Sequence, residues 1–202
     1  MRKILIIFAF LAVALGASAK FRWGPTVGAN FSRFYWKQHL IGNSTLAGFQ
    51  AGLMGELMIP GIGFGVDFGL KYANHGGRCD FGDQFVWSSE GIGDTDLRFH
   101  TIQIPIDLRF KWTRMNGFEN YVAPFIFAGP VFNFNVGNTK CEAIDRTGGS
   151  VGIQCGIGAE LWKRFQITGG YCWDVTYDTA TKKLDNFSAR IQGWNVDFTV
   201  LF

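Results

Sequence analysis

The sequence predicts an all-β fold: an eight-stranded antiparallel up-and-down transmembrane β-barrel, preceded by a cleaved signal peptide. Segments of about ten residues alternate between apolar and polar side chains, and the connections between them are alternately short and long. The chain also begins with a leader of the type that directs export. A closed sheet with apolar residues outside and polar residues inside satisfies every backbone group in lipid, which an open sheet cannot do.

The N-terminal segment has the organisation of a secretory signal peptide. Arg2 and Lys3 are positive, residues 4–15 are almost all apolar, and residues 17–19 are small. The alternative is a helical membrane anchor, but about twelve apolar residues fall short of the ~20 that a spanning helix needs. We therefore expect a signal peptide over 1–19, a mature start at Lys20 and one barrel domain over 20–202.

The composition fits a membrane barrel better than a soluble domain. The 202 residues include 27 Gly and 21 Phe, and aromatic residues make up 16% of the chain. Charged residues make up only 17%, against about 25% in soluble proteins. The formal net charge of +3 falls to about +1 once Arg2 and Lys3 are removed, and no basic run is present, so nucleic acid is not an expected partner.

The apolar alternation gives the positions of the strands. It is clearest between Ile102 and Trp112, whereas both faces of residues 121–134 are apolar and the inward face stays open. Because proline lacks an amide hydrogen, Pro124 and Pro130 predict a bulge, a place near the rim or an interruption there. The expected strands are 26–33, 47–57, 64–72, 102–112, 121–134, 151–161, 165–177 and 193–202.

The lengths of the connections predict the topology. The connections after the second, fourth and sixth strands are short, and the long ones are expected at 37–45, 74–98, 137–149 and 178–189. Outer-membrane barrels have short periplasmic turns and longer external loops, so both termini are expected to be periplasmic. Eight strands enclose a lumen that side chains can fill, so a plugged barrel is expected rather than an open pore.

The inward positions of the predicted strands gather charged residues. We expect them to form a buried, hydrogen-bonded lumen network that acts as a structural plug, since isolated buried charges are costly. The alternative is an ion or solute path, for which six acids against three bases would favour cations. A register error of one residue would exchange the two faces. The network residues are Glu56, Asp67, Lys71, Asp107, Arg109, Lys111, Glu160, Asp174 and Asp197.

The last strand has the pattern of an assembly signal. Its alternating apolar residues end on an aromatic one, which barrel-assembly machineries recognise by adding the strand to an open sheet edge. The alternatives are a half-buried strand of a soluble sandwich and a chance terminal aromatic. The signal residues are Trp194, Val196, Phe198, Val200 and Phe202.

The four cysteines do not form a metal site. Cys79 and Cys141 fall in long connections, where an exported chain can form a loop-to-loop disulfide. Cys155 and Cys172 have opposite parity on neighbouring strands and are expected to be free. The histidines His39, His75 and His100 are scattered, and we expect no metal and no cofactor.

We expect a non-enzymatic barrel with a structural, transport or adhesion role, and one alternative is a lipid-modifying enzyme with its site on the outer loops. Candidate residues are His75 or His100 with Ser88, Ser89 and Glu90, but no nucleophile motif accompanies them, and we expect no activity.

Binding by the outer loops is another possible role, because aromatic residues on loops often form recognition surfaces. The loop aromatics are Trp36, Phe81, Phe85 and Trp87. The competing architecture is a soluble, exported, lipocalin-like barrel, whose pattern would be the inverse: polar residues outside and a ligand inside.

Several short motifs resemble a known family. They are residues 102–106 (IQIPI), residues 121–130 (YVAPFIFAGP), residues 156–160 (GIGAE) and the final Phe202. In order and spacing they look like the outer-membrane β-barrel domain family of Bacteroidetes, the PorT-type group of small porin-like barrels. The resemblance implies an OmpX/OmpA-like, eight-stranded barrel in the outer membrane of a Gram-negative bacterium. The implied partners are outer-membrane lipid, the barrel-assembly machinery and a possible extracellular or secretion-complex protein.

Overall fold

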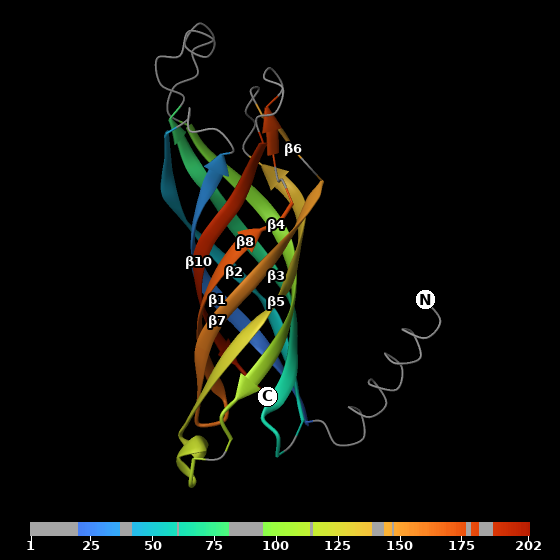
Figure 1. Ribbon diagram of the computed structural model, residues 1–202, viewed down its shortest axis with the longest axis vertical. Helices are drawn as coiled ribbons and strands as arrows, with labels where there is room; N and C mark the ends of the chain where they lie inside the picture. The colour runs from blue at the N-terminus through green and yellow to red at the C-terminus, as the bar shows by residue number, and fades with distance from the viewer. Residues whose placement is uncertain are drawn as a thin grey trace, which may run out of the picture.

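The computed structural model is a tall barrel of tilted strands (Figure 1). It describes residues 20–36, 42–59, 61–80, 95–113, 115–138, 144–146, 148–176, 179–181 and 188–202. Its strands are β1 (Lys20–Trp36), β2 (Gly42–Met58), β3 (Phe64–Asp80), β4 (Thr95–Lys111), β5 (Val122–Asn138), β6 (Ile144–Arg146), β7 (Gly149–Leu161), β8 (Phe165–Asp174), β9 (Thr179–Thr181) and β10 (Ser188–Val200). One short 3₁₀ helix, η1 (Phe118–Asn120), precedes β5.

The eight long strands close on themselves. They pair antiparallel in the order β1-β2-β3-β4-β5-β7-β8-β10, and β10 pairs with β1. At this seam, Phe202 donates its backbone N–H to the Trp23 carbonyl at 2.8 Å. The predicted eight-stranded antiparallel barrel is confirmed. The short strands β6 and β9, which were not expected, pair with each other, and β9 also pairs with the start of β10.

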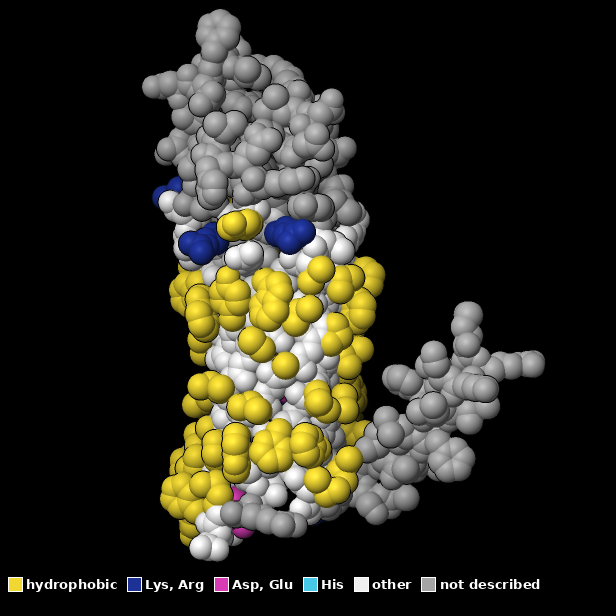
Figure 2. All heavy atoms as spheres, viewed as in Figure 1, with side chains coloured by type: hydrophobic (Ala, Val, Ile, Leu, Met, Phe, Trp, Pro, Cys, Tyr) yellow, Lys and Arg dark blue, Asp and Glu magenta, His cyan; other side chains and the backbone are white. Residues whose placement is uncertain are grey.

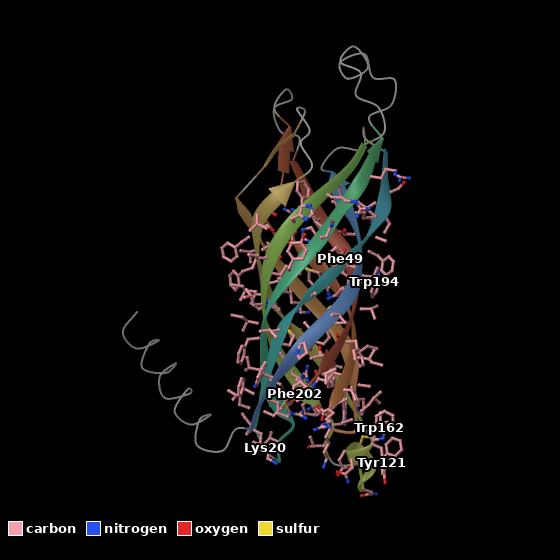
Figure 3. The ribbon with its side chains drawn as sticks, turned by 180° about the vertical axis from the view of Figure 1, so that it is seen from behind. Lys20, Phe49, Tyr121, Trp162, Trp194 and Phe202 are labelled. Carbon is pink, nitrogen blue, oxygen red and sulfur yellow. The ribbon has the colours of Figure 1, made fainter. Side chains whose placement is uncertain are left out.

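The barrel has two different ends. Lys20, Phe202 and the three short connections, 59–63, 112–121 and 162–164, lie at one end, which we call the turn end (Figures 1 and 3). The β6–β9 pair and the strand ends that precede and follow the longer connections lie at the other end, which we call the loop end. The segment 1–19, on which the signal-peptide prediction depends, lies outside the described residues.

The strands at the loop end are longer than predicted. β3 runs to Asp80 and β4 begins at Thr95, so residues 74–79 and 95–98 of the predicted connection 74–98 belong to the β3–β4 ladder. β2 likewise begins at Gly42, within the predicted connection 37–45, while β6 falls within 137–149 and β9 within 178–189. These boundaries were wrong because apolar alternation marks only the lipid-facing length of a strand, whereas the backbone ladder continues beyond it with polar residues.

The predicted strand 165–177 is too long. β8 ends at Asp174, and the backbone amides of Val175 and Thr176 both donate to the Val151 carbonyl, at 2.8 and 3.2 Å. Two donors on one acceptor end the regular ladder, in which each carbonyl receives one amide.

The outside of the barrel is apolar and the inside is polar. Figure 2 shows hydrophobic side chains gathered in two bands with a paler zone between them. Aromatic residues of the turn-side band include Tyr121, Trp162 and Phe202, and those of the loop-side band include Phe49 and Trp194 (Figure 3). Trp194 and Phe202 are 63% and 66% exposed. Such an outer face excludes the lipocalin-like alternative, because it is stable only against lipid.

Strand β5 settles the face that the sequence left open. Ala123, Phe125 and Phe127 point inward and are buried, whereas Ile126 and Phe134 are exposed on the outside. The strand is continuous through both prolines: Pro124 lies near the turn end and accepts a hydrogen bond from the Trp112 amide at 3.0 Å. The β4–β5 register is the same on both sides of Pro130, so no bulge or interruption occurs there.

Among the residues that the structure describes, no helix is long and apolar enough to cross a membrane.

Candidate functional site in the barrel lumen

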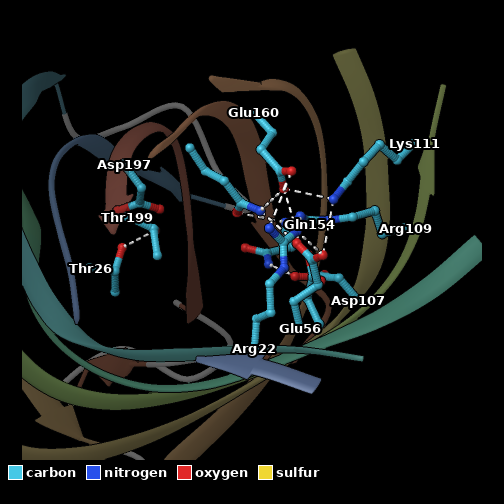
Figure 4. A network of polar contacts seen from close by, with 12 residues as sticks. Arg22, Thr26, Glu56, Asp107, Arg109, Lys111, Gln154, Glu160, Asp197 and Thr199 are labelled. Atoms are coloured by element: carbon cyan, nitrogen blue, oxygen red, sulfur yellow. Dashed lines mark hydrogen bonds and ion pairs between the residues drawn. The ribbon is translucent and has the colours of Figure 1, made fainter. Parts of the chain in front are cut away.

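The turn-side half of the lumen is crossed by a ring of four charged residues (Figure 4). Arg22 forms ion pairs with Glu56 and Glu160, and the Lys111 ammonium contacts the same two carboxylates at 3.0 and 2.7 Å. The four side chains come from β1, β2, β4 and β7, so the ring joins opposite parts of the wall. Positive and negative groups alternate around the ring, which is how buried charges are tolerated.

A second layer of contacts extends this ring. Arg109 forms ion pairs with Glu56 and with Asp67, which lies on β3. The Gln166 side chain donates to Glu56 at 2.6 Å and accepts from Arg109 at 3.2 Å. We call Arg22, Glu56, Asp67, Arg109, Lys111, Glu160 and Gln166 the charged layer. It contains three bases and three acids, so its formal charge is balanced.

Two inward phenylalanines fill the space beside the charged layer. The Arg109 guanidinium lies 3.8 Å from the centre of the Phe125 ring, a cation–π contact. Glycines on β7 make room for these rings: a Cβ at Gly158 would lie 2.4 Å from Phe125, and a Cβ at Gly156 would lie 2.6 Å from Phe127. The alternation of large and small inward residues therefore packs this part of the lumen.

Separate polar contacts occupy the middle of the barrel. The Lys71 ammonium contacts Asp197 at 2.8 Å, and Gln50 also donates to this carboxylate. The Gln154 side chain donates to Asp107 at 2.6 Å. Asp107 also lies close enough to Lys71 and to Arg109 for electrostatic attraction, so these contacts adjoin the charged layer.

The loop-side half of the lumen contains amides and hydroxyls around a small cavity. Asn133 donates to Ser150 at 3.2 Å and to Asp174 at 3.0 Å, and it accepts from Gln103 at 3.1 Å. The cavity measures about 40 Å³, and its lining includes Asn30, Gln103, Asn133 and Asp174. This volume holds a few water molecules, since one water needs ~10–15 Å³ by this measure.

The structure places all nine predicted network residues inside the barrel, where their side chains are buried. It distributes them between the charged layer, the middle pairs and the loop-side half. Arg22 was missed because the first strand was expected to begin at Thr26. The signal was present: Phe21 and Trp23 continue the outer aromatic alternation and place Arg22 inward.

The two candidate catalytic histidines that the structure describes lie on opposite faces of the wall. His75 is buried inside, and its Nε2 lies 3.0 Å from the Thr101 hydroxyl. His100 is half-exposed on the outside, where it is hydrogen-bonded to the Tyr72 hydroxyl. The other candidates, Ser88, Ser89 and Glu90, lie outside the described residues.

The structure describes the side chains of two of the four cysteines. Cys155 is exposed on the outer face, and neither it nor Cys172 forms a disulfide bond. Cys141 and the side chain of Cys79, on which the predicted disulfide depends, lie outside the described part of the chain. Within that part, no group of three His, Cys, Asp or Glu residues is placed to hold a metal ion.

One ionisable group in a turn, outside the barrel wall, has a shifted pKa. The Glu119 carboxylate accepts hydrogen bonds from the backbone amides of Met115 and Gly117, at 3.1 and 2.9 Å. Backbone hydrogen bonds, first from Glu119 itself and then from these two residues, lower the pKa of this carboxyl. This carboxylate joins the two sides of the turn, which passes through Asn116 and Gly117 at positive φ.

A closed barrel with a lipid-compatible outside and a polar, packed inside defines an outer-membrane β-barrel protein. Residues 16–179 match the family described as outer membrane protein beta-barrel domain, and the chain belongs to this family. It is an integral protein of the outer membrane.

Solved structures of other outer-membrane barrels are similar to this chain. OprG from Pseudomonas aeruginosa is 12% identical, with 91% of this chain and 95% of OprG covered and a TM-score of 0.53. Ail, the attachment invasion locus protein of Yersinia pestis, is 14% identical, with 91% and 99% covered and a TM-score of 0.47. The outer membrane enzyme PagL is 10% identical, with 86% and 98% covered and a TM-score of 0.49. No curated protein matches the sequence. At these identities the likeness concerns the fold alone.

Proposed function

We propose that this protein is a closed outer-membrane barrel that acts through its outer surface and its long loops, in a structural or surface-interaction role. The observation that carries the proposal is the charged layer, which spans the lumen and is packed against Phe125. A lumen filled in this way leaves the outside and the loop end as the surfaces available to partners. Transport through the lumen would require these ion pairs to open.

Single-channel conductance in a planar bilayer tests the closed lumen. The wild-type protein is expected to give no regular conductance steps. Phe125→Ala/Phe127→Ala removes two rings from the lumen and is expected to introduce steps. The matched control, Ile126→Ala/Phe134→Ala, removes two side chains from the lipid-facing side of the same strand and is expected to stay silent. Regular steps in the wild type would refute the proposal in favour of a pore.

The proposed orientation has the loop end outside the cell and the turn end, with both termini, in the periplasm. The short connections at the turn end support it, since outer-membrane barrels carry their short turns on the periplasmic side. An epitope inserted at residue 87 is expected to be accessible to antibody on intact cells, and one inserted at residue 117 only after the outer membrane is permeabilised. The reverse result would invert the orientation.

We propose that the barrel has no catalytic activity. The contacts of the two histidines support this, because the His75 ring is hydrogen-bonded to Thr101 inside the wall and the His100 ring to Tyr72 on its outer face. The alternative, a lipid-modifying enzyme with its site on the outer loops, is tested by incubating the folded protein with outer-membrane lipid. Hydrolysis or acyl transfer that disappears in His100→Ala would overturn the proposal.

The proposed partners are outer-membrane lipid, the barrel-assembly machinery and a protein on the cell surface. The exposed outer face of β10, which pairs with β1 at the seam, supports the role of the last strand in assembly. The resemblance to PorT-type barrels makes a secretion-complex subunit the alternative role. Crosslinking in the native outer membrane would decide for that role if it recovered a defined secretion complex.

A further inference from the structure

We propose that the tip of the turn end is a docking surface for peptidoglycan, which it binds through Trp162, Tyr121 and Lys163. This inference goes beyond the role proposed for the outer surface and the loops, and it rests on the proposed orientation, in which the turn end faces the periplasm. In Figure 3, Tyr121 and Trp162 lie nearer to the tip of the turn end than Phe202 does.

The turn between β7 and β8 has a strained backbone. Trp162 and Lys163 have φ angles of 49° and 58°, and the Arg164 amide donates to the Leu161 carbonyl at 3.0 Å. Positive φ at both central residues of a two-residue turn defines type I′. These positions favour glycine and asparagine, and bulky side chains rarely occupy them. The sequence of this turn therefore lowers its own stability.

Neither the turn nor the membrane accounts for this choice of residues. The β4–β5 connection reaches positive φ with Asn116 and Gly117, and the other residues with positive φ in the described ranges are glycines. Tryptophans exposed on the lipid-facing wall, such as Trp23 and Trp194, occupy ordinary strand positions. Trp162 instead lies in the turn itself. Strained positions of this kind cluster at functional sites, so the strain indicates a function for the displayed side chains.

Hydrogen bonds from neighbouring elements hold the turn in place. The Lys163 carbonyl accepts from Arg22 of the charged layer at 2.8 Å. The Trp162 amide donates at 2.9 Å to the carbonyl of Tyr121, the residue that precedes β5. These contacts fix the turn against β1 and β5. Binding to a preorganised surface costs less conformational entropy than binding to a mobile loop.

The displayed side chains are aromatic and cationic. Trp162 and Tyr121 are 62% and 63% exposed, and Lys163 and Arg164 are exposed beside them. The face of an aromatic ring is electronegative, so it packs against the C–H groups of a sugar ring, while the two cations attract carboxylates. Peptidoglycan offers both groups, because its sugar strands carry acidic peptides. The surface therefore matches this polymer in shape and in charge.

A polymer also fits the size of this surface better than a folded protein does. The connections at the turn end are short, at 59–63, 112–121 and 162–164, whereas a stable protein interface takes roughly 20–30 residues from each partner. A few side chains bind one repeat of a polymer weakly, and many barrels on the same polymer combine their binding. Glu119, the acidic side chain in these connections, is hydrogen-bonded to backbone amides of its own turn.

The test is cosedimentation of the folded, full-length mature barrel in detergent with purified peptidoglycan sacculi. Trp162→Asn/Lys163→Gly removes both displayed side chains and keeps the turn, because Asn-Gly is the sequence that type I′ turns prefer. It is expected to weaken binding at least tenfold and to leave the midpoint of heat unfolding at or above that of the wild type. The matched control, Lys20→Gln/Trp23→Leu, removes a lysine and a tryptophan from the start of β1 and is expected to leave binding unchanged.

Four results would overturn the proposal. Three concern binding: unchanged sedimentation of Trp162→Asn/Lys163→Gly, an equal loss in the control, and competition by polyglutamate as strong as that by soluble peptidoglycan fragments. Equal competition would mean that the surface binds acidic peptides in general. The fourth is a lowered unfolding midpoint of the test variant, which would refute the argument from strain. Because sedimentation in detergent does not depend on orientation, its failure is distinguishable from a failure of the epitope experiment.

Discussion

The two halves of the lumen are enclosed by the same eight strands but are filled in different ways. The turn-side half contains the charged layer and two phenylalanine rings, in contacts that join β1, β2, β4 and β7. The loop-side half contains mainly amides and hydroxyls around a cavity of about 40 Å³. The difference teaches that one barrel wall can enclose a cross-linked, packed half beside a half that keeps a cavity large enough for water.

The largest effect is expected from removing the acid at the centre of the charged layer. Glu56→Ala leaves Arg22, Arg109 and Lys111 without one of their carboxylate partners in a buried site. Breaking a buried ion pair in this way costs about 3–5 kcal/mol. The free energy of unfolding, measured with urea in lipid vesicles, should fall by this amount. A loss below about 1 kcal/mol, the size expected of an exposed pair, would mean that the layer is hydrated like the loop-side half.

A smaller effect is expected from filling the space that glycine leaves for Phe125. In Gly158→Val the new Cβ would lie 2.4 Å from the Phe125 ring, and such overpacking costs about 1–3 kcal/mol. The matched control is Gly169→Val on β8, where a Cβ meets nothing within 4 Å. Heating curves of the folded band on denaturing gels should separate the two variants. Similar midpoints would contradict the packed state of the turn-side half.

A still smaller loss of stability is expected from removing a hydrogen-bonding side chain in the loop-side half. Asn133→Ala removes side-chain hydrogen bonds to Ser150, Asp174 and Gln103. Because the neighbouring cavity admits water, water can replace the lost amide, and a loss of about 1 kcal/mol is expected. Urea unfolding of this variant beside Glu56→Ala gives the comparison directly. If Asn133→Ala were the more destabilising of the two, the loop-side contacts would contribute more to the free energy of unfolding than the charged layer does, contrary to this prediction.

The smallest effect on stability is expected from a substitution in the turn that contains Glu119, outside the lumen. Because the folded pKa of Glu119 is lowered, its stabilising contribution is present above its ordinary pKa of 4.5 and is lost as the pH falls through the lowered folded value. Glu119→Gln should therefore lower the unfolding midpoint slightly at neutral pH and not at all in strong acid. A difference from the wild type that is independent of pH would exclude the carboxylate as its source.

The alternation of side chains was sufficient to predict the fold and the nine inward charged residues of the predicted network. In the lipid-facing length of each strand, the outer residue must be apolar, and the inner residue is free to be polar or small. Period-two patterns such as residues 102–112 therefore specify which side chains point inward before any contact is known. Where both faces of a strand are apolar, as in 121–134, this rule gives no information, so the sequence did not predict that Phe125 points inward.

Only the tertiary structure decided which inward residues meet. Arg22 and Glu160 are 138 positions apart in the chain, and their contact depends on closure of the barrel between β1 and β10. The tertiary structure also decided how far β3 and β4 extend beyond the lipid-facing part of the wall. A backbone ladder needs a partner strand, and it does not need an apolar pattern. The sequence by itself determined the class, the number of long strands and the faces of the strands that alternate, through the lipid requirement. Closure of the sheet decided the charged layer, since contacts across a lumen join residues that no local pattern relates.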